Sequence, residues 1–155
     1  VGVTHDGMIT DAAITVGVGN VNPKDQELME ITEKSLYEGI KVAKCANTTG
    51  DIGNAIESYI KAQNKGYGII RTLSGHGVGY DVHEDPYVPN FGNKREGELL
   101  KSGMVIAIEP MINMGSEEVK VGPDGFAFVT KDNSIGVHFE HTILITEGDP
   151  EILTK

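Results

Sequence analysis

The hydrophobic pattern of this chain changes its period at about Ile69. Before that point, two segments have apolar residues mostly three or four apart, which is the spacing of helices buried on one face. After it, short apolar runs alternate with glycines and prolines, a pattern typical of strands and turns. Helices in one part and strands in the other predict an α+β fold in which two helices cover an antiparallel sheet.

The first helix is predicted to begin at Asn22-Pro23, because asparagine is a good N-cap and proline suits the first helical position. Its apolar stripe consists of Leu28, Ile31, Leu36, Ile40 and Ala43. The second helix follows Thr48-Thr49-Gly50 and ends before Gly66. Its stripe is more regular and consists of Ile52, Ala55, Ile56, Tyr59 and Ile60.

Strands are predicted on both sides of the helices. At the start of the chain, residues 1–5 and 8–16 read as two strands joined by the turn dipeptide Asp6-Gly7. In the second half, strands are expected at residues 104–111, 127–130 and 137–146. The segment 84–97 contains two prolines and two glycines and is predicted to be a loop that passes over the sheet.

Composition excludes several classes of protein. With 155 residues and no internal repeat, the chain is predicted to be a single domain, residues 1–155. The net charge of -10 would repel a phosphate backbone, so nucleic acid is not an expected partner. No apolar run approaches the roughly 18 residues of a membrane span, so no membrane contact is expected. The single Cys45 favours a reducing, cytoplasmic compartment.

Four residues with metal-binding side chains lie in or beside the predicted strands: Asp11, His76, Glu109 and Glu140. A carboxylate among apolar strand residues needs a partner, because burial of an unpaired ionised group costs several kcal/mol. A divalent cation is one such partner. Three carboxylates and one imidazole suit manganese, iron, cobalt or zinc, and carboxylates commonly bridge two ions that together activate water.

Each of these residues also has a simpler interpretation. A buried glutamate is more often the partner of arginine or lysine, although only Arg71 and Arg95 supply guanidinium groups here. His76 taken alone reads as a hydrogen-bonded core histidine. The remaining histidines, His5, His138 and His141, are interpreted as surface or supporting groups.

Four motifs that follow one another along the chain help to decide between metal ligands and the simpler interpretations. They are His76 to Gly79, His83 to Asn90, Gly103 to Met111 and Phe139 to Thr142. Together they resemble the C-terminal part of the type I methionine aminopeptidases, and the resemblance runs from about Val1 to Ile145. It implies the pita-bread fold, here a single catalytic domain over residues 1–155 that lacks its N-terminal part. It also implies a pair of divalent metal ions and removal of the N-terminal methionine from nascent polypeptides.

The resemblance also implies roles for particular residues. The metal ligands of the family fall on Asp11, His76, Glu109 and Glu140. Metal-activated water would attack the first peptide carbonyl, with Glu109 shuttling the proton. His83 would contact the scissile peptide, and the pocket for the methionine side chain would use Val82, Met111 and Phe126.

The chain departs from the family pattern at several points. The first aspartate ligand and a substrate-contacting histidine of the family would fall before Val1. Phe126 stands where the family usually has tryptophan, and Tyr80 where many members have arginine. The resemblance therefore implies that this chain alone binds one divalent ion firmly, and that the missing N-terminal half is a partner of the complete centre.

Three functions remain open from the sequence. The first is methionine aminopeptidase. The second is a catalytically silent pita-bread domain that binds a protein or peptide; such domains usually lose ligands within their motifs. The third is a proline-specific peptidase of the same fold, in which the last motif usually has Glu-Asp where this chain has Glu140-His141.

Overall fold

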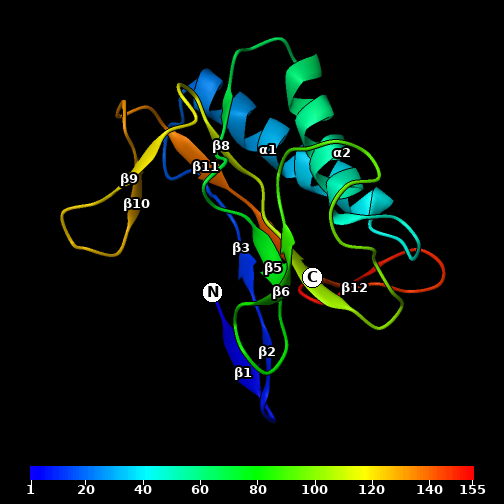
Figure 1. Ribbon diagram of the computed structural model, residues 1–155. Helices are drawn as coiled ribbons and strands as arrows, with labels where there is room; N and C mark the ends of the chain where they lie inside the picture. The colour runs from blue at the N-terminus through cyan, green and yellow to red at the C-terminus, as the bar shows by residue number, and fades with distance from the viewer.

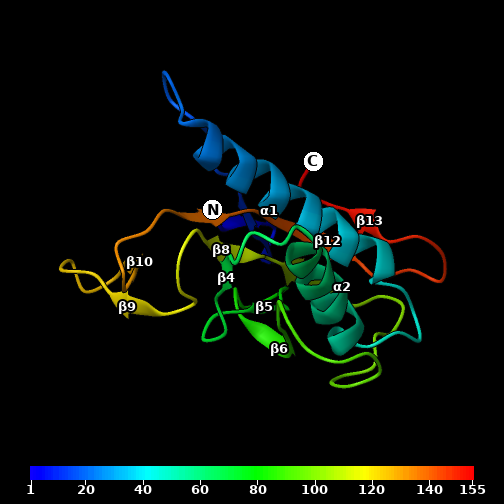
Figure 2. The ribbon, with the colours of Figure 1, turned by 90° about the horizontal axis from the view of Figure 1, so that it is seen from above.

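The computed structural model describes residues 1–155 and has the predicted α+β fold. Helix α1 spans Pro23–Val42 and helix α2 spans Thr49–Ala62. Both helices pack on the same side of the strands, as Figures 1 and 2 show from two directions. The prediction of two helices covering an antiparallel sheet is confirmed.

Both helices begin at side chains that satisfy free backbone N–H groups. The Asn22 side chain accepts a hydrogen bond from the backbone N–H of Lys24 at 2.9 Å, and Pro23 follows at the first helical position. In α2, Thr48 and Asp51 form a capping box, in which each side chain bonds the backbone N–H of the other. The sequence pattern therefore fixes both helix starts locally.

The strands are short, and all their pairings are antiparallel. Their bounds are β1 Val3–His5, β2 Met8–Thr10, β3 Ala12–Ala13, β4 Gly68–Ile69, β5 Gly75–Gly77, β6 Glu84–Val88, β7 Val105–Ile108, β8 Met111–Asn113, β9 Val119–Val121, β10 Phe128–Thr130, β11 Gly136–His138, β12 Glu140–Leu144 and β13 Glu151–Ile152.

These strands form one larger sheet and three smaller ones. The larger sheet has the order β13-β12-β7-β5-β6, and β3 also pairs with β12. A second sheet has the order β11-β8-β4, and β1-β2 and β9-β10 are separate pairs. The pair β1-β2 projects away from the helices at the foot of Figure 1.

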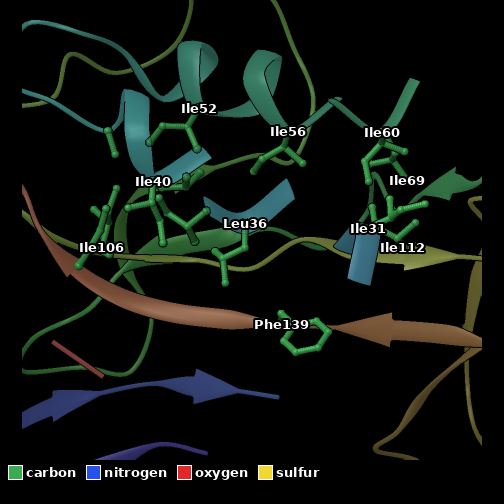
Figure 3. Close-up of a cluster of buried hydrophobic side chains, with 14 of the residues drawn as sticks. Ile31, Leu36, Ile40, Ile52, Ile56, Ile60, Ile69, Ile106, Ile112 and Phe139 are labelled. Carbon is green, nitrogen blue, oxygen red and sulfur yellow. The ribbon is translucent and has the colours of Figure 1, made fainter. Parts of the chain in front are cut away.

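The hydrophobic core lies between the helices and the strands. Side chains of α1 and α2 meet isoleucines of the two largest sheets. Figure 3 shows Leu36 and Ile40 of α1 together with Ile52 and Ile56 of α2, and Ile106 beside Ile40. Most of these side chains have no measurable exposure to solvent. The stripes predicted for both helices therefore face the core.

The segment 84–97 is not entirely the predicted loop, because its first five residues form strand β6. Proline lacks the N–H group that a central strand must donate, so it is tolerated mainly at sheet edges. Strand β6 is the last in its sheet, which is why Pro86 is compatible with a strand here.

Three segments that were predicted as continuous strands are interrupted. The first breaks at Asp11 between β2 and β3, the second at Glu109-Pro110 between β7 and β8, and the third at Phe139 between β11 and β12. In all three cases the chain leaves one sheet and enters another at the break. Each break lies at or next to a predicted metal ligand.

Candidate metal centre

The strand breaks bring three carboxylates together. Glu140 begins β12, and β12 pairs on one side with β7, which ends directly before Glu109. On its other side β12 pairs with β3, which begins directly after Asp11. All three side chains lie largely inside the molecule: Asp11 is 17% exposed and Glu109 is 12% exposed, and residue Glu140 is 4% exposed.

His76 reaches this cluster from β5, the strand between β6 and β7. Its neighbours are glycines because β5 lies very close to both adjacent strands: a methyl group at Gly75 would lie 2.2 Å from the backbone oxygen of Ala107. His76 Nδ1 lies 2.9 Å from the backbone oxygen of Gly77. This contact favours the tautomer in which Nδ1 carries the proton and Nε2 is available as a ligand. His76 Nε2 lies 3.6 Å from Glu109 Oε1.

Two sets of three ligand atoms are close enough to hold a metal ion, each set having its atoms within 4.8 Å of one another. The first set is Asp11, His76 and Glu140, and the second is Glu109, His138 and Glu140. Glu140 is common to both sets. Carboxylate and imidazole donors in this combination suit a borderline divalent cation.

The simpler interpretation of the glutamates, as partners of arginine or lysine, does not fit the structure. Arg71 pairs with Glu57 and Glu117 on the surface. The ion pairs of Glu109 are with His76 and His138. The cluster thus concentrates negative charge without a guanidinium or Lys ammonium to neutralise it.

The charge of the cluster perturbs Glu140 most. Burial, together with the neighbouring Glu109 and Asp11 carboxylates, raises the pKa of Glu140 to about 7. Both causes disfavour the ionised form. A carboxyl perturbed by desolvation and by specific like charges is typical of functional sites. A divalent cation would remove the repulsion that the three carboxylates exert on one another.

Thr142, which is fully buried in β12, holds the backbone of Asp11. Its hydroxyl accepts a hydrogen bond from the Asp11 N–H at 2.9 Å and donates one to the Asp11 carbonyl at 2.7 Å. A single side chain thus satisfies both backbone groups at the break between β2 and β3. Thr142 therefore positions a candidate ligand without belonging to either ligand set.

Replacing Thr142 with valine, which keeps the shape and removes the hydroxyl, is expected to weaken the binding of Mn²⁺ about 10- to 100-fold. The reason is that the Asp11 backbone loses both hydrogen bonds. Isothermal titration calorimetry measures the affinity. The matched control is Thr146→Val, because the Thr146 hydroxyl bonds Asp149 in a surface loop. Equal affinities for the two variants would contradict the positioning role.

A cavity of about 700 Å³ lies beside the cluster. Its lining includes Glu109, His83 and Met111. The ring of His83 stands edge-on to that of His76, with 4.4 Å between the ring centroids. The cavity therefore reaches the carboxylate of Glu109, which directly follows β7.

The other two residues predicted to bind substrate do not line this cavity. Val82 is exposed near the chain start, and Phe126 is 88% exposed in the turn between β9 and β10. Phe128 and Val129, on the strand that follows this turn, line the cavity instead. The structure therefore brings together His83, Met111, Glu109 and the ligand cluster, and leaves Val82 and Phe126 apart from them.

His138 belongs to the cluster, although its residue type and position alone predict a surface or supporting group. Its Nε2 lies 3.1 Å from Glu109 Oε2. The signal in the sequence was the spacing of His138 and Glu140 by two residues, since alternate residues of a strand share a face. Sequence alone could not show that this face is the one turned toward Glu109.

The fold and the cluster of carboxylates and imidazoles define a candidate divalent-metal centre in a pita-bread protein. The model of metallopeptidase family M24 matches residues 1–147. The chain therefore belongs to that metallopeptidase family. Neither of its helices combines the length and the apolar character that a membrane span requires.

Comparisons with individual proteins support membership of this family. The chain is 47% identical over 153 residues to a methionine aminopeptidase of Clostridium perfringens, which covers 99% of this chain and 61% of the relative. The crystal structure of the methionine aminopeptidase of Thermotoga maritima superposes with a TM-score of 0.95 and 43% identity, covering 99% and 61% of the two chains. A prolidase of Pyrococcus furiosus superposes less closely, with a TM-score of 0.75 and 28% identity over 99% and 39%. The chain thus spans about three fifths of the length of its methionine aminopeptidase relatives.

Proposed function

We propose that this chain carries the catalytic centre of a methionyl aminopeptidase, which removes the N-terminal methionine of nascent polypeptides. The observation that carries the proposal is the convergence of three carboxylates and His76 beside a cavity lined by Met111 and other apolar groups. A pocket of this size and character suits a flexible thioether side chain. The stronger resemblance to methionine aminopeptidases than to a prolidase supports the same choice.

The metal ligands in this proposal are Asp11, His76, Glu109 and Glu140. They would hold cobalt, manganese, iron or zinc, two ions in a complete centre and one firmly in this chain alone. When bound, such ions make water a nucleophile at neutral pH and polarise a carbonyl oxygen. The donor set fits this cofactor, because Glu140 is buried among like charges and has no Lys or Arg ion partner.

The side chains of the chain itself would perform the remaining steps. Glu109 would take the proton of the attacking water and return it to the leaving amine, a role supported by its position between the ligand cluster and the cavity. His83 would donate a hydrogen bond to the carbonyl oxygen of the first residue, where negative charge develops. Met111, which lines the cavity, would contact the methionine side chain.

The partners and compartment follow from the same proposal. The substrate is the N-terminal methionine of a nascent peptide, and an N-terminal half outside this chain would complete the centre. A cytoplasmic location fits the single free Cys45. Nucleic acid and membranes are not proposed partners, since the chain carries a net charge of -10.

Release of free methionine from a Met-Ala-Ser peptide tests the proposal. The assay uses the chain with Mn²⁺ or Co²⁺, alone and combined with the N-terminal segment of a methionine aminopeptidase relative. Metal-dependent release of methionine in either arm is the expected result. Binding of the intact peptide without release in both arms would identify a silent binding domain instead. Faster cleavage of an Xaa-Pro peptide would identify a proline-specific peptidase.

A further inference from the structure

The side chain of Asn90 lies deep inside the protein although it is polar. Asn90 follows strand β6 and is 1% exposed. Its Nδ2 donates a hydrogen bond at 3.0 Å to the backbone oxygen of Glu109. Its Oδ1 is shielded from solvent and has no hydrogen-bond partner. Burial of an amide oxygen without a partner costs free energy, so packing alone does not explain an asparagine at this position.

Glu109 lies at a point where the sheets do not hold the backbone. Strand β7 ends at Ile108 and β8 begins at Met111, so Glu109 belongs to neither strand. The next residue is Pro110, which has no N–H group to donate. A hydrogen bond from a side chain can satisfy a backbone group at such a break. Asn90 supplies one to the carbonyl of Glu109.

Helix α2 fixes the segment that carries Asn90. A methyl group at Gly53 of α2 would lie 2.7 Å from the backbone oxygen of Pro89 and closer still to that of Phe91. Only glycine allows the backbone of a neighbouring segment to come this near. The helix therefore contacts the chain on both sides of Asn90.

The end of the same segment is bonded to α2 through both backbone groups of Gly92. Asn54 Nδ2 donates to the Gly92 carbonyl at 3.0 Å, and the Gly92 N–H donates to Glu57 Oε2 at 3.3 Å. Both side chains project from α2. Segment 89–92 is thus attached to the helix, and Asn90 extends from it to Glu109.

We propose that Asn90 is a positioning residue, which fixes the backbone of Glu109 and thereby the place of its carboxylate. The support begins at α2, continues through segment 89–92 and ends at the hydrogen bond from Asn90 Nδ2. Groups behind a metal ligand determine its orientation and commonly affect affinity about 10-fold or more. The inference rests on the proposed function, in which Glu109 binds metal and moves the proton of the attacking water.

Replacement of Asn90 by leucine tests this role, because leucine has a similar size and no polar group. The chelator-stripped variant is expected to bind Mn²⁺ about 10-fold more weakly than the wild type. Isothermal titration calorimetry measures the affinity. The visible absorption bands of bound Co²⁺ depend on the geometry of its ligands. These bands are expected to differ between Asn90→Leu and the wild type.

Stability separates a positioning role from an ordinary structural one. Metal-free Asn90→Leu is expected to keep the urea midpoint of the wild type, because removal of the unpartnered Oδ1 offsets the loss of one hydrogen bond. The matched control is Asn47→Leu, since Asn47 Nδ2 donates to the Val42 carbonyl at 2.7 Å at the end of α1. This control is expected to lower the urea midpoint and to leave the Mn²⁺ affinity and the Co²⁺ bands unchanged.

A second variant, Asn54→Ala, acts on the same support from its other end. Asn54 is only partly buried, so the variant is expected to fold, and it removes the bond to the Gly92 carbonyl without changing Asn90. A smaller effect of the same kind on the Mn²⁺ affinity and the Co²⁺ bands is expected. Circular dichroism establishes that each variant retains the fold.

The outcomes separate this inference from the proposed function. Wild-type Mn²⁺ affinity and unchanged Co²⁺ bands in Asn90→Leu would overturn the positioning role and leave the metal centre intact. If Asn90→Leu does not fold, the same result in Asn54→Ala would overturn it. Absence of Mn²⁺ and Co²⁺ binding in the wild type would overturn the proposed function and this inference together.

Discussion

Replacing Gly77 with alanine is expected to lower the free energy of unfolding by roughly 3 kcal/mol or more. A methyl group at this position would lie 2.1 Å from the backbone oxygen of Asp85 and 3.0 Å from that of Glu84. Both oxygens belong to β6, which pairs with β5 at Gly77. Neither oxygen can retreat unless the two strands separate. Because His76 lies in the same short strand, metal binding is expected to weaken as well.

Urea denaturation with a chelator present measures the change in stability, and calorimetric titration with Mn²⁺ measures the change in affinity. The matched control is Gly2→Ala, since a methyl group there meets only Val82 Cγ2, at an ordinary distance of 3.8 Å. The control is expected to stay within about 0.5 kcal/mol of the wild type. A wild-type unfolding midpoint for Gly77→Ala would contradict the close packing of β5 against β6.

The helices could be predicted from the sequence because their signals are local. Asn22-Pro23 caps α1 as expected, and the apolar stripes of both helices face the core. Capping and helical periodicity depend on residues within a few positions of one another. Tertiary contacts need not be known to recognise them.

The strand breaks could not be predicted in the same way. An apolar run such as residues 104–111 has strand character throughout, and only Pro110 hints at an interruption. The break occurs because β7 pairs with β12 and β5, whereas β8 pairs with β11 and β4. Which strands pair depends on residues far apart in the chain, so local pattern alone extends each strand past its end.

The candidate site was predicted only in part for the same reason. Residue types and the family resemblance pointed to Asp11, His76, Glu109 and Glu140, and the structure brings all four together. His138 could not be assigned to the cluster from the sequence, because its position depends on the pairing of β11 with β8. The cavity wall of Phe128 and Val129 likewise depends on how the β9-β10 pair is placed.

Glu140 makes the stability of the metal-free protein depend on pH in a direction opposite to that of a salt-bridged carboxylate. Its pKa is raised by burial and by Glu109 and Asp11, from an ordinary value of 4.5 to about 7 in the folded protein. Below about 4.5 the carboxyl is neutral in both states, and its contribution to stability is fully present. As the pH rises through 7, the folded protein must ionise a buried group among like charges, and that contribution is lost.

Replacing Glu140 with glutamine is therefore expected to stabilise the metal-free protein relative to the wild type by roughly 2–3 kcal/mol at pH 8, and by little at pH 4.5. Urea denaturation with a chelator at several pH values measures the difference, in which groups common to both proteins cancel. With Mn²⁺ at 100 times its dissociation constant, the wild type is expected to gain about 2.7 kcal/mol and the variant much less, because glutamine offers the cation no charge. A stability difference that stays constant from pH 4.5 to 8 would mean that Glu140 ionises normally in the folded chain. Such a result would contradict the inference that the three carboxylates repel one another when no cation is bound.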